Sequence, residues 1–526
     1  MVDDLQNTQF QLPYTSLTGK VQNNTADCIL QLKDLKDKER YLIAGTVEAK
    51  NGNNDLHFDP KNLLLNYESW NIDSDNLIRF GPKGMYANQL KLSKDRSSIE
   101  LQSESQKTNA PLAINFKDFK IETLTSIAEK SDLTISGTTN GSVLLKNVTQ
   151  TPVFTSNLTI TDFAFKKDTV GTINIQVDNI IANSYNAKIV ITGQDNQVNF
   201  DGTYKTGNGV MDFNLDIVKL NLKSIQGFTL DNLKESTGFF NGNFKITGTT
   251  DQPKMIGDLK LNEIGFKVTP LNATFKSMND AVLFTNDAIL FDHFTIKDEK
   301  DNDLDINGKI NSTNFNNFGF DLTLDASNFK ALNSKEKDNP LYYGEVYLDN
   351  HLRIKGDFNN PIVDGDIKVN KDTKLTIVMP QSDPSIADRE GIVEFIDQDN
   401  PSMIETIAVD ENLSKTEIKG INASVNIEVD KEAELSIVID KSNGDFLKLK
   451  GEAQLNGGID PSGKTTLTGR YELKEGAYEM SFNFIKRKFD IKSGSYILWT
   501  GEPTSADINI TAVYKNQAAP IDLIDD

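Results

Sequence analysis

Apolar and polar residues alternate along much of this chain. Residues 173–177 read Ile-Asn-Ile-Gln-Val, and the same period of two recurs in many other segments. Such alternation predicts β-strands that have one apolar face and one polar face. Asn-Gly pairs, as at Asn51, Asn140 and Asn307, predict turns between strands. The pattern therefore predicts an all-β protein.

The most distinctive segment lies between Gly469 and Tyr514. It contains a G-x-Y-x-L-x-x-G-x-Y hairpin, a K-R-x-F-x-I strand, a G-S-x-I-x-W-x-G-x-P turn and a closing A-D-I-x-I-x-A-x-Y strand. Gly476, Gly494 and Gly501 are expected to mark the turns. Taken in order, these motifs resemble the C-terminal signature of the TamB family of envelope-spanning proteins. The resemblance covers most of residues 220–514 and is strongest at 469–514.

This resemblance implies an elongated β-sheet that is folded lengthwise into a U-shaped groove with an apolar lumen. TamB-like and AsmA-like proteins are bridge-like lipid-transfer proteins, so the implied location is the periplasm of a diderm bacterium. The implied partners are phospholipid acyl chains, a BamA-like outer-membrane barrel of the TamA type, and the inner membrane through an anchor helix that this chain lacks. Because family members are longer, we expect the chain to be an internal piece of a larger protein.

A second pattern repeats about every hundred residues. Gly248 and Gly356 are each followed by Pro five residues later and by Gly four residues after that. The aligned anchors of four copies, Ser156, Gly257, Gly365 and Gly469, are 101, 108 and 104 residues apart. Such a period predicts a repeated structural unit.

The anchors of this repeat lie inside continuous strand patterns, so the sequence predicts no sharp domain boundary. Residues 1–220 are interpreted as the N-terminal part of the groove, without a diagnostic motif. Residues 221–526 are interpreted as the TamB-like region, with the signature at 469–514.

Composition argues against several classes of function. Lys and Arg total 55 against 76 for Asp and Glu, which gives a net charge of −21. An acidic chain is a poor partner for nucleic acid, whose affinity comes from cationic contacts. Cys28 is the only cysteine and the three histidines are far apart, so no metal site or cofactor is expected. Asp303 and Asp305 resemble the start of a calcium loop, but their spacing favours an alternating strand.

No catalytic motif supports an enzyme, so the candidate site is the apolar face itself. That face must leave water against a second sheet, in a closed barrel, under helices, or against a bound apolar ligand. Helical periodicity is scarce, and the resemblance implies the bound ligand. The candidate lining consists of in-phase apolar residues of the longest strands: Val425, Ile427, Val429, Leu435, Ile437, Ile439, Leu447, Leu449, Phe482 and Phe484. Alternation alone does not distinguish lipid from a second sheet.

Two aromatic residues of the signature, Trp499 and Tyr514, are candidates for lumen lining or for contact with a partner strand, against the alternative of core packing. Residues 117–129 predict a short helix. Residues 380–390 predict a loop, and residues 396–416 are polar.

Three functions are compatible with these patterns. The leading hypothesis is a non-enzymatic envelope protein that shields acyl chains during phospholipid transfer between the inner and outer membranes. The second is an assembly factor for outer-membrane β-barrel proteins or autotransporters that acts by strand pairing. The third is a surface adhesin built from tandem β-sandwiches.

Overall fold

The computed structural model describes residues 4–6, 11–34, 36–82, 84–125, 134–148, 152–181, 183–277, 279–313, 317–379, 420–441, 444–482 and 485–515. Its regular structure is almost entirely β-strand, which confirms the all-β prediction. The described helices are α1 (Glu122–Thr125), α2 (Leu222–Ile225) and the 3-10 turn η1 (Gln226–Thr229). Each is a single turn, so helices supply no covering layer within the described ranges.

The chain divides into two compact units. Unit 1 comprises residues 1–266 and 278–287. Its strands are β1 (Asp4–Gln6), β2 (Gln11–Pro13), β3 (Thr15–Gln22), β4 (Thr25–Lys33), β5 (Glu39–Lys50), β6 (Asn53–Leu65), β7 (Glu68–Ser69), β8 (Asn71–Ile72), β9 (Leu77–Gly81), β10 (Gly84–Asn88), β11 (Leu90–Lys94), β12 (Ser97–Ser103), β13 (Leu112–Lys120), β14 (Ile135–Lys146), β15 (Val153–Phe165), β16 (Asp168–Asp178), β17 (Ser184–Gly193), β18 (Asn196–Lys205), β19 (Val210–Asn221), β20 (Leu233–Thr249), β21 (Pro253–Val268) and β23 (Ala281–Phe284).

Unit 2 comprises residues 267–277 and 288–526. Its strands are β22 (Ala273–Ser277), β24 (Ala288–Lys297), β25 (Asp303–Asn311), β26 (Gly319–Ser334), β27 (Tyr342–Asp357), β28 (Asn360–Val369), β29 (Lys374–Val378), β30 (Asn422–Val429), β31 (Glu434–Asp440), β32 (Asp445–Ile459), β33 (Thr465–Phe482), β34 (Ile485–Ile491), β35 (Tyr496–Gly501), β36 (Ala506–Asn509) and β37 (Ala512–Tyr514).

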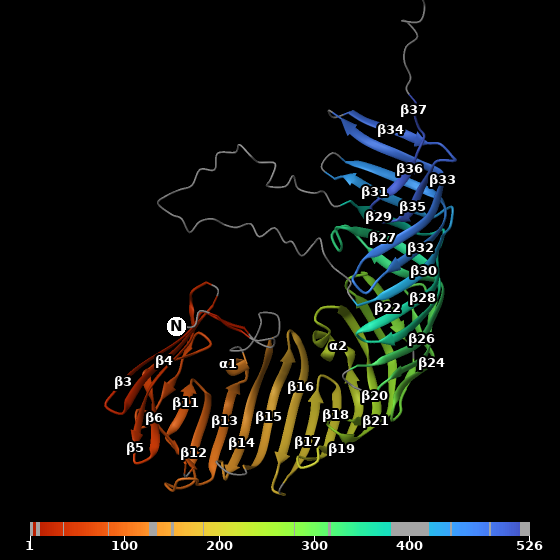
Figure 1. Ribbon diagram of the computed structural model, residues 1–526. Coiled ribbons are helices and arrows are strands. Elements are labelled where there is room, and N and C mark those ends of the chain that lie inside the picture. The colour runs from red at the N-terminus through yellow and green to blue at the C-terminus, as the bar shows by residue number, and fades with distance from the viewer. Residues whose placement is uncertain are drawn as a thin grey trace, which may run out of the picture. The chain divides into compact units, whose positions relative to one another are not determined.

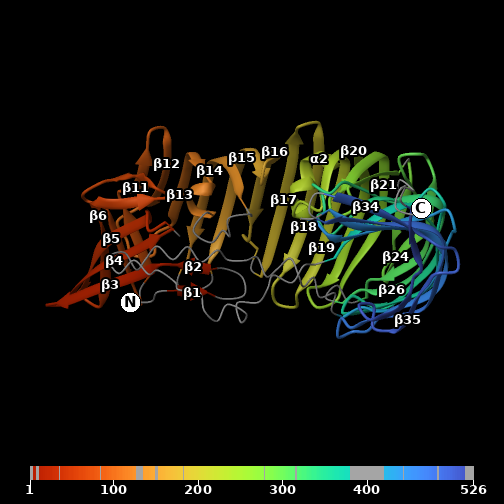
Figure 2. The same ribbon diagram turned by 90° about the horizontal axis from the view of Figure 1, so that it is seen from above.

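Strands that are neighbours in sequence are mostly neighbours in each sheet. In unit 1, strands β11 to β20 pair antiparallel in chain order, and Figure 1 shows β13 to β19 standing side by side. Figure 2 shows the same order for β14 to β19 from above. In unit 2, β24 to β28 and β32 to β35 also follow chain order. The strand order is that of long single sheets, as a lengthwise groove requires, and not that of small two-layer sandwiches.

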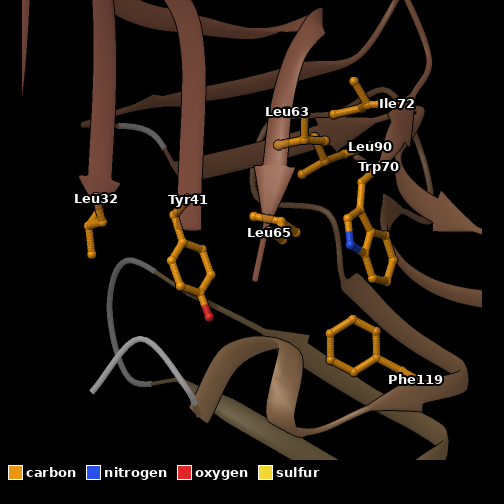
Figure 3. Close-up of a cluster of buried hydrophobic side chains, with 8 residues drawn as sticks. All are labelled: Leu32, Tyr41, Leu63, Leu65, Trp70, Ile72, Leu90 and Phe119. Atoms are coloured by element: carbon orange, nitrogen blue, oxygen red, sulfur yellow. The ribbon is translucent and has the colours of Figure 1, made fainter. Parts of the chain in front are cut away.

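A separate sheet packs against the first strands of this order in unit 1. Strands β3 to β7, β9 and β10 form it, and eight buried apolar side chains lie where it meets β8, β11 and β13 (Figure 3). Tyr41 is 1% exposed and its hydroxyl donates a hydrogen bond of 3.0 Å to the carbonyl oxygen of Thr123. Trp70 and Phe119 pack with their ring centroids 5.8 Å apart. The apolar side chains are therefore fully sealed at this place.

Two Asn-Gly pairs that predict turns lie inside strands instead, so those two predictions are wrong. Asn140 and Asn307 each face a β-bulge on the neighbouring strand, where two residues oppose one. Their side-chain oxygens accept the backbone N–H groups of the bulge residues Asp118 and His293, at 2.9 and 2.8 Å. Both bulge residues have positive φ, 45° and 50°.

The glycine of each pair is needed for close approach of the next strand. Gly141 has φ 125°, and a Cβ there would lie 2.1 Å from the backbone oxygen of Asn157. Gly308 has φ 117°, and a Cβ there would lie 2.2 Å from the backbone oxygen of Asp321. Asn-Gly therefore serves here as the partner of a bulge, in both units.

Two further local predictions need correction. The predicted hairpin at 469–478 is one uninterrupted strand, because Gly476 lies within β33, whereas Gly494 does mark the turn between β34 and β35. In the predicted helix at 117–129, residues 117–120 belong instead to β13, which places Phe119 in the buried cluster, and residues 122–125 form α1, while residues 126–129 lie outside the described residues. The predicted loop at 380–390 and the polar segment 396–416 lie outside the described residues.

Unit 2 contains a duplicated strand that the sequence analysis missed. Residues 367–378 and 427–438 share the pattern I-x-V-x-K-x-x-x-L-x-I-V. The two copies pair in parallel, β28 with β30 and β29 with β31, and every pair joins equivalent residues sixty positions apart, as in Ile367↔Ile427 and Leu375↔Leu435. Lys368 Nζ lies 2.7 Å from Glu428 Oε1, between equivalent positions of the two copies.

Removing one copy should therefore leave a sound sheet. Deleting residues 365–424 joins Asp364 directly to Val425, so a single strand replaces β28 and β30. That strand would pair with β27 on one side and with β32 on the other, and both pairings would be antiparallel. We expect cooperative thermal unfolding and an unchanged β-sheet signal per residue, measured by circular dichroism.

The matched control lacks residues 365–425, one residue more. That single-residue slip turns the side chains after the junction to the opposite face, and this variant should unfold at a markedly lower temperature or aggregate. Equal melting temperatures for the two deletions would contradict the duplication.

Candidate functional site

Strand register in unit 1 arranges apolar side chains in rows that cross the strands. One row passes through ten successive strands, from β11 to β20, with each residue paired to the next: Leu92, Ile99, Phe116, Gly141, Leu158, Ile175, Ile189, Phe200, Leu215 and Phe244. No position in this row carries a polar side chain. Apart from Gly141, its members are half-buried or buried.

The adjacent row across the same strands is polar throughout. It consists of Lys91, Glu100, Asn115, Ser142, Asn157, Gln176, Lys188, Asp201, Asn214 and Lys245. All except Glu100 are exposed. Because successive residues of a strand point to opposite faces, the sheet has one apolar face and one hydrated face. We call these the apolar face and the polar face.

Unit 2 follows the same rule. A polar row crosses eight strands through Asp305, Asp325, His351, Asp366, Asn426, Asn456, Thr468 and Thr500. Hydrogen bonds link some of its neighbours: Asn426 Nδ2 donates to Asp366 Oδ1 at 2.9 Å, and Asn456 Nδ2 donates to Asn426 Oδ1 at 3.0 Å. Asp305 thus belongs to strand β25 and not to a calcium loop.

The apolar face of unit 2 carries most of the candidate lining residues. Val425, Ile427 and Val429 of β30 lie in three successive apolar rows. Leu435 pairs with Leu449, and Ile437 with Leu447, in two further rows. Val429, Leu435, Ile437 and Leu447 all pack against one buried cluster that contains Leu449, Ala453, Tyr471, Leu473, Ile491 and Ile497. The structure therefore brings residues from β30, β31 and β32 together.

Five of the ten candidates are not placed in that cluster, and two of them, Val425 and Ile427, lie in apolar rows through β30. Ile439 lies at an irregularity in the pairing of β31 with β32 and is 42% exposed. Phe482 ends β33, and its side chain lies outside the described residues, as does the whole of Phe484.

Both signature aromatic residues extend apolar rows. Trp499 follows Ile427, Leu455 and Gly469 in one row, and its indole nitrogen donates to the carbonyl oxygen of Pro503 at 3.1 Å. Tyr514 ends the row that contains Ile437, Leu447, Tyr478 and Phe489. The rings of Phe489 and Tyr514 lie 5.4 Å apart, and Tyr514 is 46% exposed. The pairing register shows that Trp499 and Tyr514 belong to apolar rows, and the sequence alone does not reveal this register.

A cavity of about 720 Å³ lies on the opposite side of this sheet. Residues of β27, β28, β30, β32 and β33 line it, among them the polar Asp349, His351, Asp366, Lys368 and Glu428 together with Ile367, Ile427 and Leu455. The charged side chains in this lining belong to the polar face, and they make the cavity a poor site for an acyl chain.

The structure points to no metal centre in the part of the chain that it describes. No group of three or more His, Cys, Asp or Glu side chains there is arranged to hold a metal ion. Within the same ranges, no helix has the length and apolar character needed to cross a bilayer.

These features define a class of protein that consists of long β-sheets with a continuous apolar face and a polar face. The chain belongs to the TamB family, because residues 183–288 and 292–524 match the TamB C-terminal domain. No curated protein and no solved structure was found to match the chain. TamB-family proteins are transport and assembly factors of the cell envelope, so the chain is a cell-envelope protein.

If the apolar face holds lipid, charges placed on it should reduce bound lipid. Replacing Ile427 and Ile437 together by Asp puts two carboxylates among apolar side chains, where an ionised carboxylate is poorly tolerated. We expect phospholipid that co-purifies with the protein to fall several-fold, measured by mass spectrometry of extracted lipid.

The control replaces Asn426 and Ser436, their neighbours on the polar face, by Asp. This variant carries the same added charge and should retain wild-type lipid. Thermal unfolding of both variants shows whether each is folded. Equal lipid content in two folded variants would contradict the assignment.

Proposed function

We propose that this chain shields phospholipid acyl chains on its apolar face during transfer between the inner and outer membranes. The observation that carries the proposal is the unbroken apolar row across ten strands of unit 1, with a fully polar row on the opposite face. One face of such a sheet can contact hydrocarbon along its whole length, while the other face contacts water.

The energetics favour such a surface for lipid transfer. Exposing an acyl chain of ~15 methylene groups to water costs roughly 12 kcal/mol at ~0.8 kcal/mol per group. That cost corresponds to about nine powers of ten in population, so an unassisted phospholipid rarely crosses an aqueous gap. A surface that accompanies the chain removes most of this barrier, while the polar headgroup remains hydrated.

The apolar row of unit 1 is only partly buried, as expected for a surface that binds an acyl chain reversibly. Leu158, Ile175, Ile189, Phe200 and Leu215 are half-buried, unlike the sealed side chains around Tyr41. Half-buried apolar side chains in successive strands gain free energy when hydrocarbon covers them. The middle strands of unit 1 are therefore the part of the surface that we assign to cargo.

Membership of the TamB family supports the same location and suggests the partners. We propose that the chain acts in the periplasm and that a BamA-like barrel of the TamA type receives it at the outer membrane. Pairing between a free strand edge and the barrel would provide the contact. The inner-membrane connection would come from an anchor helix.

Photo-crosslinking in cells tests the proposal. A photoreactive amino acid in place of Ile175, on the apolar face, should form adducts with phospholipid. The same amino acid in place of Gln176, its neighbour on the polar face, should form none. Adducts are identified by mass spectrometry of the purified protein.

Two results would overturn the proposal. Phospholipid adducts at equal yield from both positions would show that labelling ignores the apolar face. Polypeptide adducts from Ile175 without lipid would favour an assembly factor that pairs with nascent outer-membrane strands.

A further inference from the structure

Tyr471 is a buried polar group on the apolar face. Its side chain is 3% exposed, and no described residue provides a hydrogen-bond partner for its hydroxyl. Buried polar groups in folded proteins are nearly always paired, and an unpaired one destabilises the fold. The hydroxyl of Tyr471 can therefore donate a hydrogen bond to an acceptor that the described residues do not supply.

The surroundings of Tyr471 are apolar. It pairs with Ala453 on β32 and Ile497 on β35, and the cluster around it also contains Leu449, Leu473 and Ile491. Val429 lies in the same row, beyond Ala453. None of the cluster members carries a charge, and Ala453 leaves little side-chain bulk beside the ring. The cluster resembles an interior for hydrocarbon with one hydroxyl group in it.

Burial also fixes the role of that hydroxyl as a donor. It raises the pKa of Tyr471 to about 12, so the group stays protonated throughout the physiological range. A phosphate would bring a negative charge into a cluster that holds no compensating cation, which is unfavourable. A neutral oxygen with a hydrocarbon chain attached to it meets both conditions.

We propose that Tyr471 donates a hydrogen bond to the ester carbonyl oxygen of a bound glycerolipid, whose acyl chain displaces the partly buried members of this cluster. The inference rests on the proposed function and adds a chemical selectivity to it. Tyr471 is then a specificity-determining residue that distinguishes acyl esters from alkyl ethers, because an ether-linked chain has no carbonyl oxygen at that position.

Competition between two synthetic lipids tests the proposal. A fluorescent phosphatidylglycerol bound to the full chain is displaced either by diacyl phosphatidylglycerol or by its dialkyl ether analogue of equal chain length. Wild-type protein should prefer the ester by about fivefold, the usual worth of one neutral hydrogen bond. Tyr471→Phe should remove the preference by weakening ester binding alone. Tyr496→Phe, a partly buried control that pairs with Glu472 and Asn509 on the polar face, should retain it.

Thermal unfolding of the lipid-free protein gives a second readout. Because Tyr471→Phe removes an unpaired buried hydroxyl, it should raise the melting temperature of the lipid-free protein. A lower melting temperature would show that the hydroxyl is already paired, and would overturn the inference.

The possible outcomes distinguish failure of the lipid-binding function from failure of the role of Tyr471. If wild-type protein binds neither lipid, the proposed function fails. If it binds both lipids with equal affinity, or if Tyr471→Phe keeps the ester preference, the role of Tyr471 fails while the lipid-binding function stands.

Discussion

Register between neighbouring strands is the constraint on which the rest of the structure depends. Side chains alternate along a strand, so a slip of one residue would move every apolar side chain of that strand to the polar face. In unit 1, the pairing keeps Leu158, Ile175, Ile189, Phe200 and Leu215 in one row across five strands. The fold therefore depends less on any single buried residue than on the register between each strand and the next.

The β-bulges show how the same face of a strand stays apolar when the strand contains an extra residue. Where β13 and β24 each carry one residue too many, Asp118 and His293 adopt positive φ, and Asn140 and Asn307 accept their N–H groups. Phe116 and Phe119 flank the first bulge, and Phe291 and Phe294 flank the second, with ring centroids 5.8 and 5.6 Å apart. Each bulge thus absorbs the extra residue and returns the strand to the same face.

Sequence alone was sufficient for properties that depend on period two. Period two predicted the all-β class and the shared face of residues such as Val425 and Val429, and the ordered motifs of 469–514 predicted the resemblance to the TamB family, which the family match confirms. Sequence alone failed where the outcome depends on which strands pair: Asn-Gly at Asn140 is equally a turn signal and a bulge partner until the neighbouring strand is known. For the same reason, alternation did not reveal the parallel duplication or the row that joins Ile437 to Tyr514, and composition did not reveal the isolated hydroxyl of Tyr471.

The apolar face differs in character along the chain. Near Tyr41 in unit 1, apolar side chains are sealed against one another and need no further cover. Near Leu449 in unit 2, half-buried side chains such as Ile437 and Leu447 border the buried cluster, which contains the hydroxyl of Tyr471. In the middle strands of unit 1 the apolar side chains remain half-buried, and a layer of hydrocarbon would complete their burial. The account thus assigns stability to the sealed cluster near Tyr41, and cargo to strands β14 to β19 and to the apolar face of unit 2 beside Tyr471.

The central claim is that this apolar face is open to hydrocarbon and not to a second protein layer. Site-directed spin labelling of residues 173–178 in β16, one at a time, measures it most directly through collisions with oxygen and with a water-soluble nickel complex. With bound lipid, the account predicts that odd-numbered positions collide with oxygen but not with nickel, and that even-numbered positions collide with nickel. Odd-numbered positions that are immobile and closed to both reagents would indicate a sealed protein core and contradict the account.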